Sequence, residues 1–133
     1  MKTVKQTITW SILILVFVTG CKKYEEGPGF SLRSKKERVA NNWKIVYAYD
    51  YKDSIDVTQD YVGETWEFTK WGEFTERDNG SIDKTGTWEF ANDKERITIK
   101  FPLDVDNYDI LKLREDEIWL KDTDEELHLV PAN

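Results

Sequence analysis

The stretch that decides the fold is residues 65–90, TWEFTKWGEFTERDNGSIDKTGTWEF. Apolar and polar residues alternate along three segments of this stretch, which is the period of a half-buried β-strand. In the first segment Trp66 and Phe68 share one face. Between the second and third segments, Asn79-Gly80 is the strongest short hairpin signal, because both residue types tolerate the positive φ that a tight turn requires. The stretch therefore predicts three antiparallel strands in chain order.

The alternation continues on both sides of this stretch. The third segment gives one parity to Ile82, Trp88 and Phe90, and the upstream segment WKIVYAYDY (43–51) places five side chains on one face. Those five are Trp43, Ile45, Tyr47, Tyr49 and Tyr51. Downstream, alternating segments run over 96–101, 108–115, 117–122 and 126–130. About eight short strands with tight connections follow.

Such a nearest-neighbour sheet leaves exposed edges unless it closes on itself. Eight strands is the number at which an up-and-down barrel closes around packed side chains or one small ligand. The sequence thus predicts an all-β fold, a small antiparallel up-and-down β-barrel, with a β-sandwich as the alternative closure. A short N-terminal helix should precede it, because Ser34 and Glu37 have the spacing of a capping box; we expect that helix to end near Asn41 or Asn42.

Length and charge narrow the class of protein. The chain has 133 residues, which favours one domain, and its 14% aromatic content argues against disorder. Asp and Glu number 26 against 19 Lys and Arg, for a formal charge of −7. An acidic surface repels phosphate backbones, so nucleic acid is not an expected partner.

The N-terminal segment has the form of a secretory signal. Residues 1–5 carry two lysines and no acid, and residues 8–18 form an apolar stretch interrupted only by Thr9 and Ser11. That stretch is too short to span a bilayer, which needs about 20 apolar residues, but it suits the apolar region of a signal peptide. We expect a signal peptide over 1–20, a flexible tether with Gly27, Pro28 and Gly29 over 21–31, and a single barrel domain over 32–133.

The sequence Val18-Thr19-Gly20-Cys21 resembles the lipobox of bacterial lipoproteins. That resemblance implies a lipid on the thiol of Cys21, the only cysteine of the chain, and cleavage directly before it. It also implies an address: Lys22 follows the cysteine where an aspartate would favour retention at the inner membrane, which points to the outer membrane. KKYEE (22–26) resembles a signal for export to the cell surface.

The arrangement NNWKIVYAY, ETWEFTKWGEFTE, GTWEF and RITIKF resembles the small lipocalin-like domains of Gram-negative lipoproteins, over about residues 32–130. The resemblance implies a barrel and, by analogy of fold, binding of a small hydrophobic ligand. Asn41 stands where the first strand of classical lipocalins has a glycine, and the arginine expected late in such barrels is not evident. These departures put the usual closure of the barrel base in doubt.

Large aromatic side chains are the candidate ligand contacts. Each is expected in the core, and if the barrel holds a cavity, they line it, because pockets are mostly apolar with a few placed polar groups. These predicted ligand-binding residues are Trp43, Tyr47, Tyr49, Trp66, Phe68, Trp88 and Phe90.

The sequence gives little support for catalysis or for metal binding. The single histidine, His128, has the opposite parity to Leu127 and Leu129, so we expect it to face solvent rather than act as a base. The acids of DVDNYD (104–109) and DTDEE (122–126) lack the glycine and distant glutamate of a calcium loop and are expected to form solvated turns. We predict no enzyme, no metal and no cofactor.

Two functions are left nearly equal. One is a lipid-anchored binding protein with a small hydrophobic ligand in the barrel. The other is an interaction or structural module of an outer-membrane or cell-surface complex, with a filled core and an envelope protein on its outer face, where Trp71 and Trp119 are expected to point outward. A small hydrolase would need two acids across a cleft, which no spacing here indicates.

Overall fold

The structure is a computed structural model that describes residues 33–133. The predicted signal peptide, Cys21 and the tether lie outside the described residues. Within residues 33–133, no helix has the length and apolar character needed to cross a bilayer. The described elements are α1 (Lys35–Val39), β1 (Asn42–Asp50), β2 (Ile55–Asp56), the 3-10 helix η1 (Thr58–Tyr61), β3 (Glu64–Phe68), β4 (Glu73–Asp78), β5 (Ser81–Ala91), β6 (Arg96–Lys100), β7 (Val105–Leu113), β8 (Ile118–Lys121) and β9 (Glu125–Pro131).

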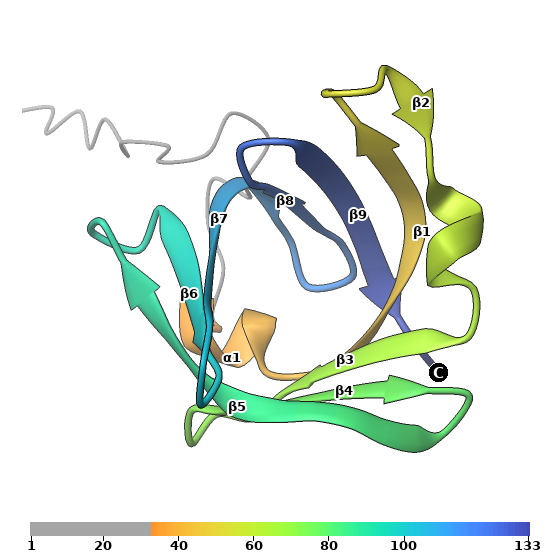
Figure 1. The fold of residues 1–133 in the computed structure, drawn as a ribbon. Helices are drawn as coiled ribbons and strands as arrows, with labels where there is room; N and C mark the ends of the chain where they lie inside the picture. Colours follow the sequence, from red (N-terminus) through yellow and green to blue (C-terminus); the bar gives the residue numbers. More distant parts are fainter. Residues whose placement is uncertain (1–32) are drawn as a thin grey trace, which may run out of the picture.

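Eight of the strands close into one antiparallel barrel. From β3 to β9 each strand pairs with the next, and β1 pairs with both β3 and β9, which completes the ring seen in Figure 1. The predicted eight-stranded up-and-down barrel is confirmed, and the sandwich alternative is excluded. The two residues of β2 form an additional short pair with the end of β1.

The predicted capping box forms at α1. The Ser34 hydroxyl accepts a hydrogen bond from the Glu37 backbone N–H, and the Glu37 carboxylate accepts one from the Ser34 N–H. The helix ends at Val39, earlier than predicted, because Asn42 already belongs to β1. The indole Nε1 of Trp43 then donates to the Val39 carbonyl at 2.8 Å, which ties the end of the helix to the barrel.

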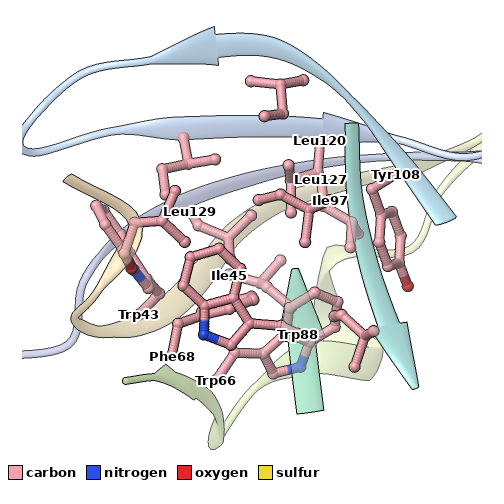
Figure 2. Close-up of a cluster of buried hydrophobic side chains, with 14 of the residues drawn as sticks. Trp43, Ile45, Trp66, Phe68, Trp88, Ile97, Tyr108, Leu120, Leu127 and Leu129 are labelled. Atoms are coloured by element: carbon pink, nitrogen blue, oxygen red, sulfur yellow. The ribbon is translucent and has the colours of Figure 1, made fainter. Parts of the chain in front are cut away.

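The barrel interior is packed with large side chains. Trp66 contacts Phe74 edge-on, and Phe68 contacts both Phe74 and Trp88 in the same manner, with ring centroids 5.0–5.7 Å apart. Such edge-to-face pairs add to the stabilisation from burial alone. Figure 2 shows Trp66, Phe68 and Trp88 among aliphatic side chains from other strands, which include Ile45, Ile97, Leu120, Leu127 and Leu129.

Asn79 and Gly80 form the predicted turn between β4 and β5. Their φ angles are 48° and 85°, so both adopt the left-handed conformation that a two-residue hairpin turn uses. Gly80 adopts it without the steric cost of a Cβ.

Three β-bulges shift which side chains face inward. The register of β1 against β9 moves from Ile45–Leu129 to Tyr47–His128, so Val46 is an extra residue on β1. Ala48 is therefore buried, and Tyr47 and Tyr49 face outward; the prediction that these tyrosines share the face of Trp43 is wrong.

The second bulge lies on β5, where Asp83 is the extra residue between Ile82 and Lys84. Ile82 is exposed as a result, and its predicted placement on the face of Trp88 is also wrong. The third bulge adds Leu111 to β7, so that Ile110 and Leu113 both reach the core.

Candidate functional site

The end of the barrel opposite α1, which we call the mouth, is bounded by the β1–β3 connection, the β4–β5 turn, the β6–β7 loop and the β8–β9 turn. β1 pairs with β3 only over Asn42–Lys44, so the two strands separate toward the mouth. β2 and η1 occupy this part of the connection. From η1, the Tyr61 hydroxyl donates to the Glu125 carboxylate on β9 at 2.7 Å.

The inward-facing positions change from apolar to charged as the strands reach the mouth. On β3, Glu64 lies two residues before the buried Trp66, and on β4, Glu76 lies two residues after the buried Phe74. Because side chains alternate between the two faces of a strand, both glutamates face inward. By the same alternation the inward charged side chains at this end include the acids that we call the mouth carboxylates, Glu64, Glu76, Asp106 and Glu125, together with Lys84.

Burial disfavours the charged form of all four mouth carboxylates. It is the largest cause that raises the pKa of each, and for Glu76, which Glu64 also repels, the pKa rises to about 7. Lys84 acts in the opposite direction on Glu64, Glu76 and Asp106. Acids whose pKa values are raised in this way often mark functional sites.

Aromatic rings form the floor beneath these acids. The Trp66 indole Nε1 donates to Glu64 Oε1 at 2.6 Å, and the ring of Trp66 lies 5.7 Å from that of Tyr108. Trp66 therefore contacts both the packed core and the charged residues of the mouth.

The hydroxyl of Tyr108 has no hydrogen-bond partner among the described residues; the residue is only 8% exposed, but the hydroxyl oxygen is not among its fully buried atoms. Figure 2 shows this hydroxyl at the end of the ring that points away from the core cluster. Burial raises the pKa of Tyr108, and the nearby acids Asp106, Asp122, Glu125 and Glu76 raise it further. The hydroxyl therefore stays protonated among the mouth carboxylates, free to donate and accept.

A cleft of about 380 Å³ lies at the same end of the barrel, between β5 and the β6–β7 loop. Lys84, Thr85, Phe101, Pro102, Leu103 and Asp104 line it. Leu103 is fully exposed there. The cleft adds apolar surface at this end of the barrel, and Lys84 is the residue that it shares with the inward charged side chains of the mouth.

The predicted aromatic contacts separate into three groups. Trp43, Phe68 and Trp88 are core residues, and Phe90 packs against the core in a partly buried position. Trp66 alone among them bonds a mouth carboxylate. Tyr47 and Tyr49 lie on the outer face. Binding of a ligand by any of the seven stays a prediction.

The structure adds residues that sequence reasoning missed, namely the mouth carboxylates and Tyr108. A signal for them was present, since Glu64 has the parity of Trp66, and Asp106 has that of Tyr108. Residues 104–109 were predicted to form one loop, which is wrong: Val105–Leu113 is β7, and its alternation turns Asp106 inward while Asp109 pairs with Arg96.

The outer wall carries an aromatic stack. His128 faces outward as predicted, and its ring lies between Trp119, at 4.0 Å and nearly parallel, and Tyr47, at 4.7 Å. Its Nε2 is 2.7 Å from the Glu126 carboxylate. Trp119 and the 79%-exposed Trp71 also point outward, as predicted.

Within residues 33–133, no group of three or more histidine, cysteine, aspartate or glutamate side chains could hold a metal ion. The mouth carboxylates are thus not spaced to chelate a metal ion.

The closed eight-stranded barrel, with a small helix at the end opposite the mouth, defines a lipocalin-like fold. A lipocalin-like protein from Bacteroides uniformis has a similar crystal structure, with a TM-score of 0.57 and 14% identity, over 71% of this chain and 98% of that one. An uncharacterised protein from Bacteroides eggerthii is also similar, with a TM-score of 0.53 and 11% identity, over 69% of this chain and 98% of that one. No protein-family model and no curated protein matches the chain.

Proposed function

We propose that this protein is a lipid-anchored binding protein of the bacterial envelope that takes a small ligand with an apolar part at the mouth of its barrel. Binding, rather than catalysis, fits an interior in which the lower part is filled and the polar groups gather at one end. The lipocalin-like fold agrees with such a role by analogy only.

The observation that carries the proposal is the unpartnered hydroxyl of Tyr108. The Tyr108 residue is only 8% exposed, but its hydroxyl oxygen is not among the buried atoms that lack a partner, so this oxygen is open to a ligand that enters the mouth. Trp66 beside it, and the cleft that Phe101 and Leu103 line, supply the apolar surface that a small-molecule site needs.

Native mass spectrometry tests this proposal. The full chain should be extracted in a mild detergent from the membranes of the organism that encodes it. We expect an additional small-molecule mass that leaves the protein at higher collision energy. The variant Tyr108→Leu should lose this mass, and Tyr47→Leu, on the outer wall, should keep it. Equal retention by both variants would place the ligand elsewhere.

A second function has its own support. The stack of Tyr47, His128 and Trp119 on the outer wall offers aromatic surface of the kind that protein interfaces favour. This arrangement suits the alternative role as an interaction module of an envelope complex. A co-purifying protein that Trp119→Ala releases, without any small-molecule mass, would favour this role over ligand binding.

The anchor is a separate part of the proposal. One acyl chain binds a membrane only marginally, and stable attachment takes more than one; a lipidated Cys21 would meet that need. Cys21→Ser should leave the protein unprocessed and without incorporated radiolabelled palmitate. Palmitate incorporation into this variant would refute the anchor, and recovery of the native protein in the inner-membrane fraction would refute the proposed outer-membrane address.

A further inference from the structure

We propose that the ligand of the mouth carries a positively charged group with N–H donors, such as a primary ammonium or a guanidinium, beside its apolar part. This inference rests on the proposed function and names the chemical class of its ligand.

The charge of the mouth is the first observation that favours a cationic ligand. Glu64, Glu76, Asp106 and Glu125 face inward at the mouth, and Lys84 is the basic side chain that acts on three of them. An anionic ligand would add to this excess of negative charge in a half-buried place, where electrostatic repulsion is screened less than at the surface. A cation would relieve it.

The Tyr108 hydroxyl is an independent observation that points to a ligand. The residue is nine-tenths buried, its hydroxyl is not among the fully buried atoms without a partner, and no described residue bonds this hydroxyl, on which Asp106, Glu125 and Glu76 act electrostatically. A phenol oxygen accepts hydrogen bonds from N–H donors. An ammonium or guanidinium at this point would bond both the hydroxyl and a carboxylate, because it carries at least three donors.

The spacing of the acids and the aromatic rings beside them favour an organic cation over a metal ion. The described acids do not form a group close enough to ligate a metal. The rings of Trp66 and Tyr108, 5.7 Å apart, present aromatic surface beside the acids, and organic cations are attracted to such ring faces. The site therefore suits a polyatomic cation whose apolar part rests on the floor or in the cleft beside Phe101.

Three probes test the inference: 4-phenylbutylamine, 4-phenylbutan-1-ol and 4-phenylbutanoate, which share a phenyl ring on four carbons and end in a cationic, a neutral and an anionic group. Binding should be measured by isothermal titration calorimetry at pH 8, with the full chain in phosphatidylcholine nanodiscs and empty nanodiscs as the blank. We expect the amine to bind at least about tenfold more tightly than the alcohol, because hydrogen bonds between charged groups are stronger than those of a neutral hydroxyl. The carboxylate should bind most weakly.

Two variants and one control locate the effect. Glu64→Gln/Glu76→Gln keeps the side-chain shapes and should weaken the amine about tenfold while leaving the alcohol nearly unchanged. The control Glu67→Gln/Glu89→Gln removes the same charge from the outward faces of β3 and β5, where these acids pair with Arg77 and Lys100, and should leave all three probes unchanged. Tyr108→Phe should weaken the amine about threefold or more without lowering stability, since it removes an unpartnered hydroxyl.

The outcomes separate the two proposals. Equal binding of amine and alcohol, or an equal effect of the mouth and control variants on the amine, overturns the inference of a cationic ligand and leaves the binding function standing. An absence of binding by all three probes to the folded protein overturns both. Tighter binding of the carboxylate than of the amine would overturn the inference and indicate an anionic ligand.

Discussion

Glu76 shows how one residue connects the mouth to the stability of the barrel. Its pKa is raised from 4.5 to about 7, first by burial and then by Glu64, with Lys84 opposing and Asp83 adding to the rise. A carboxyl whose pKa is raised on folding stabilises the folded state fully only below the unfolded pKa. That contribution is lost as the pH rises from about 4.5 to about 7.

Replacing Glu76 by glutamine removes this dependence. We expect Glu76→Gln to be more stable than the wild type at pH 8 by on the order of 1 kcal/mol, since one pKa unit corresponds to about 1.4 kcal/mol and solvent screens part of the shift. At pH 5 the difference should be small, because the folded protein then holds Glu76 protonated. Urea denaturation at both pH values measures it, with Glu89→Gln as the control. An equal effect at pH 5 and pH 8 would show that Glu76 is not buried as described.

At the scale of residues, the sequence predicted the core residues better than the residues of the mouth. Trp43, Trp66, Phe68 and Trp88 were expected to be core residues, and all are buried. Glu64 and Asp106 were not recognised as inward, because acids near turns are usually solvated. Only the closure of the barrel brings acids from separate strands together around the hydroxyl of Tyr108.

Among the elements, the eight strands and the Asn79-Gly80 turn could be predicted because local alternation and turn chemistry agree there. The bulges could not. An extra residue such as Val46 leaves no mark in the hydrophobic pattern, and it is set by how β1 must bend to meet β9. The faces of Tyr47 and Ile82 were therefore predicted wrongly, although their strands were right.

Gly86 on β5 gives a test at this scale. A Cβ at this position would press against the Lys100 carbonyl oxygen and the Phe101 ring on the neighbouring strand. We expect Gly86→Ala to lower the free energy of unfolding by about 1–3 kcal/mol, as overpacking does. Thermal denaturation followed by circular dichroism measures it, with the exposed neighbour Thr85→Ala as the control. If Gly86→Ala and Thr85→Ala melt together, β5 and β6 do not approach each other this closely.

For the whole molecule, closure depends on α1 as well as on the strands. Trp43 at the start of β1 is fully buried and bonds the Val39 carbonyl, and Arg38 bonds the Leu113 carbonyl at the end of β7 at 3.2 Å. The helix thus joins two strands on different sides of the ring and covers the end opposite the mouth. The unusual Asn41, in place of a glycine, does not prevent this closure.

Replacing Trp43 by phenylalanine removes the indole hydrogen bond and part of the packing. We expect Trp43→Phe to cost about 2 kcal/mol of unfolding free energy, while Trp71→Phe, at a largely exposed position, should cost almost nothing. Guanidinium denaturation measures both variants. Equal midpoints for the two would mean that α1 contributes little to the closed barrel.

The pairing of β1 with both β3 and β9 has a consequence for how copies of the domain meet. Within the described part of the chain, the ring of strands leaves a neighbouring copy few edges to extend, namely β2 and the part of β1 beyond Lys44, where β1 separates from β3. Copies of the domain at high local concentration would therefore resist polymerising by sheet extension. Any self-association would have to depend on side chains and loops, so single substitutions could strengthen or weaken it.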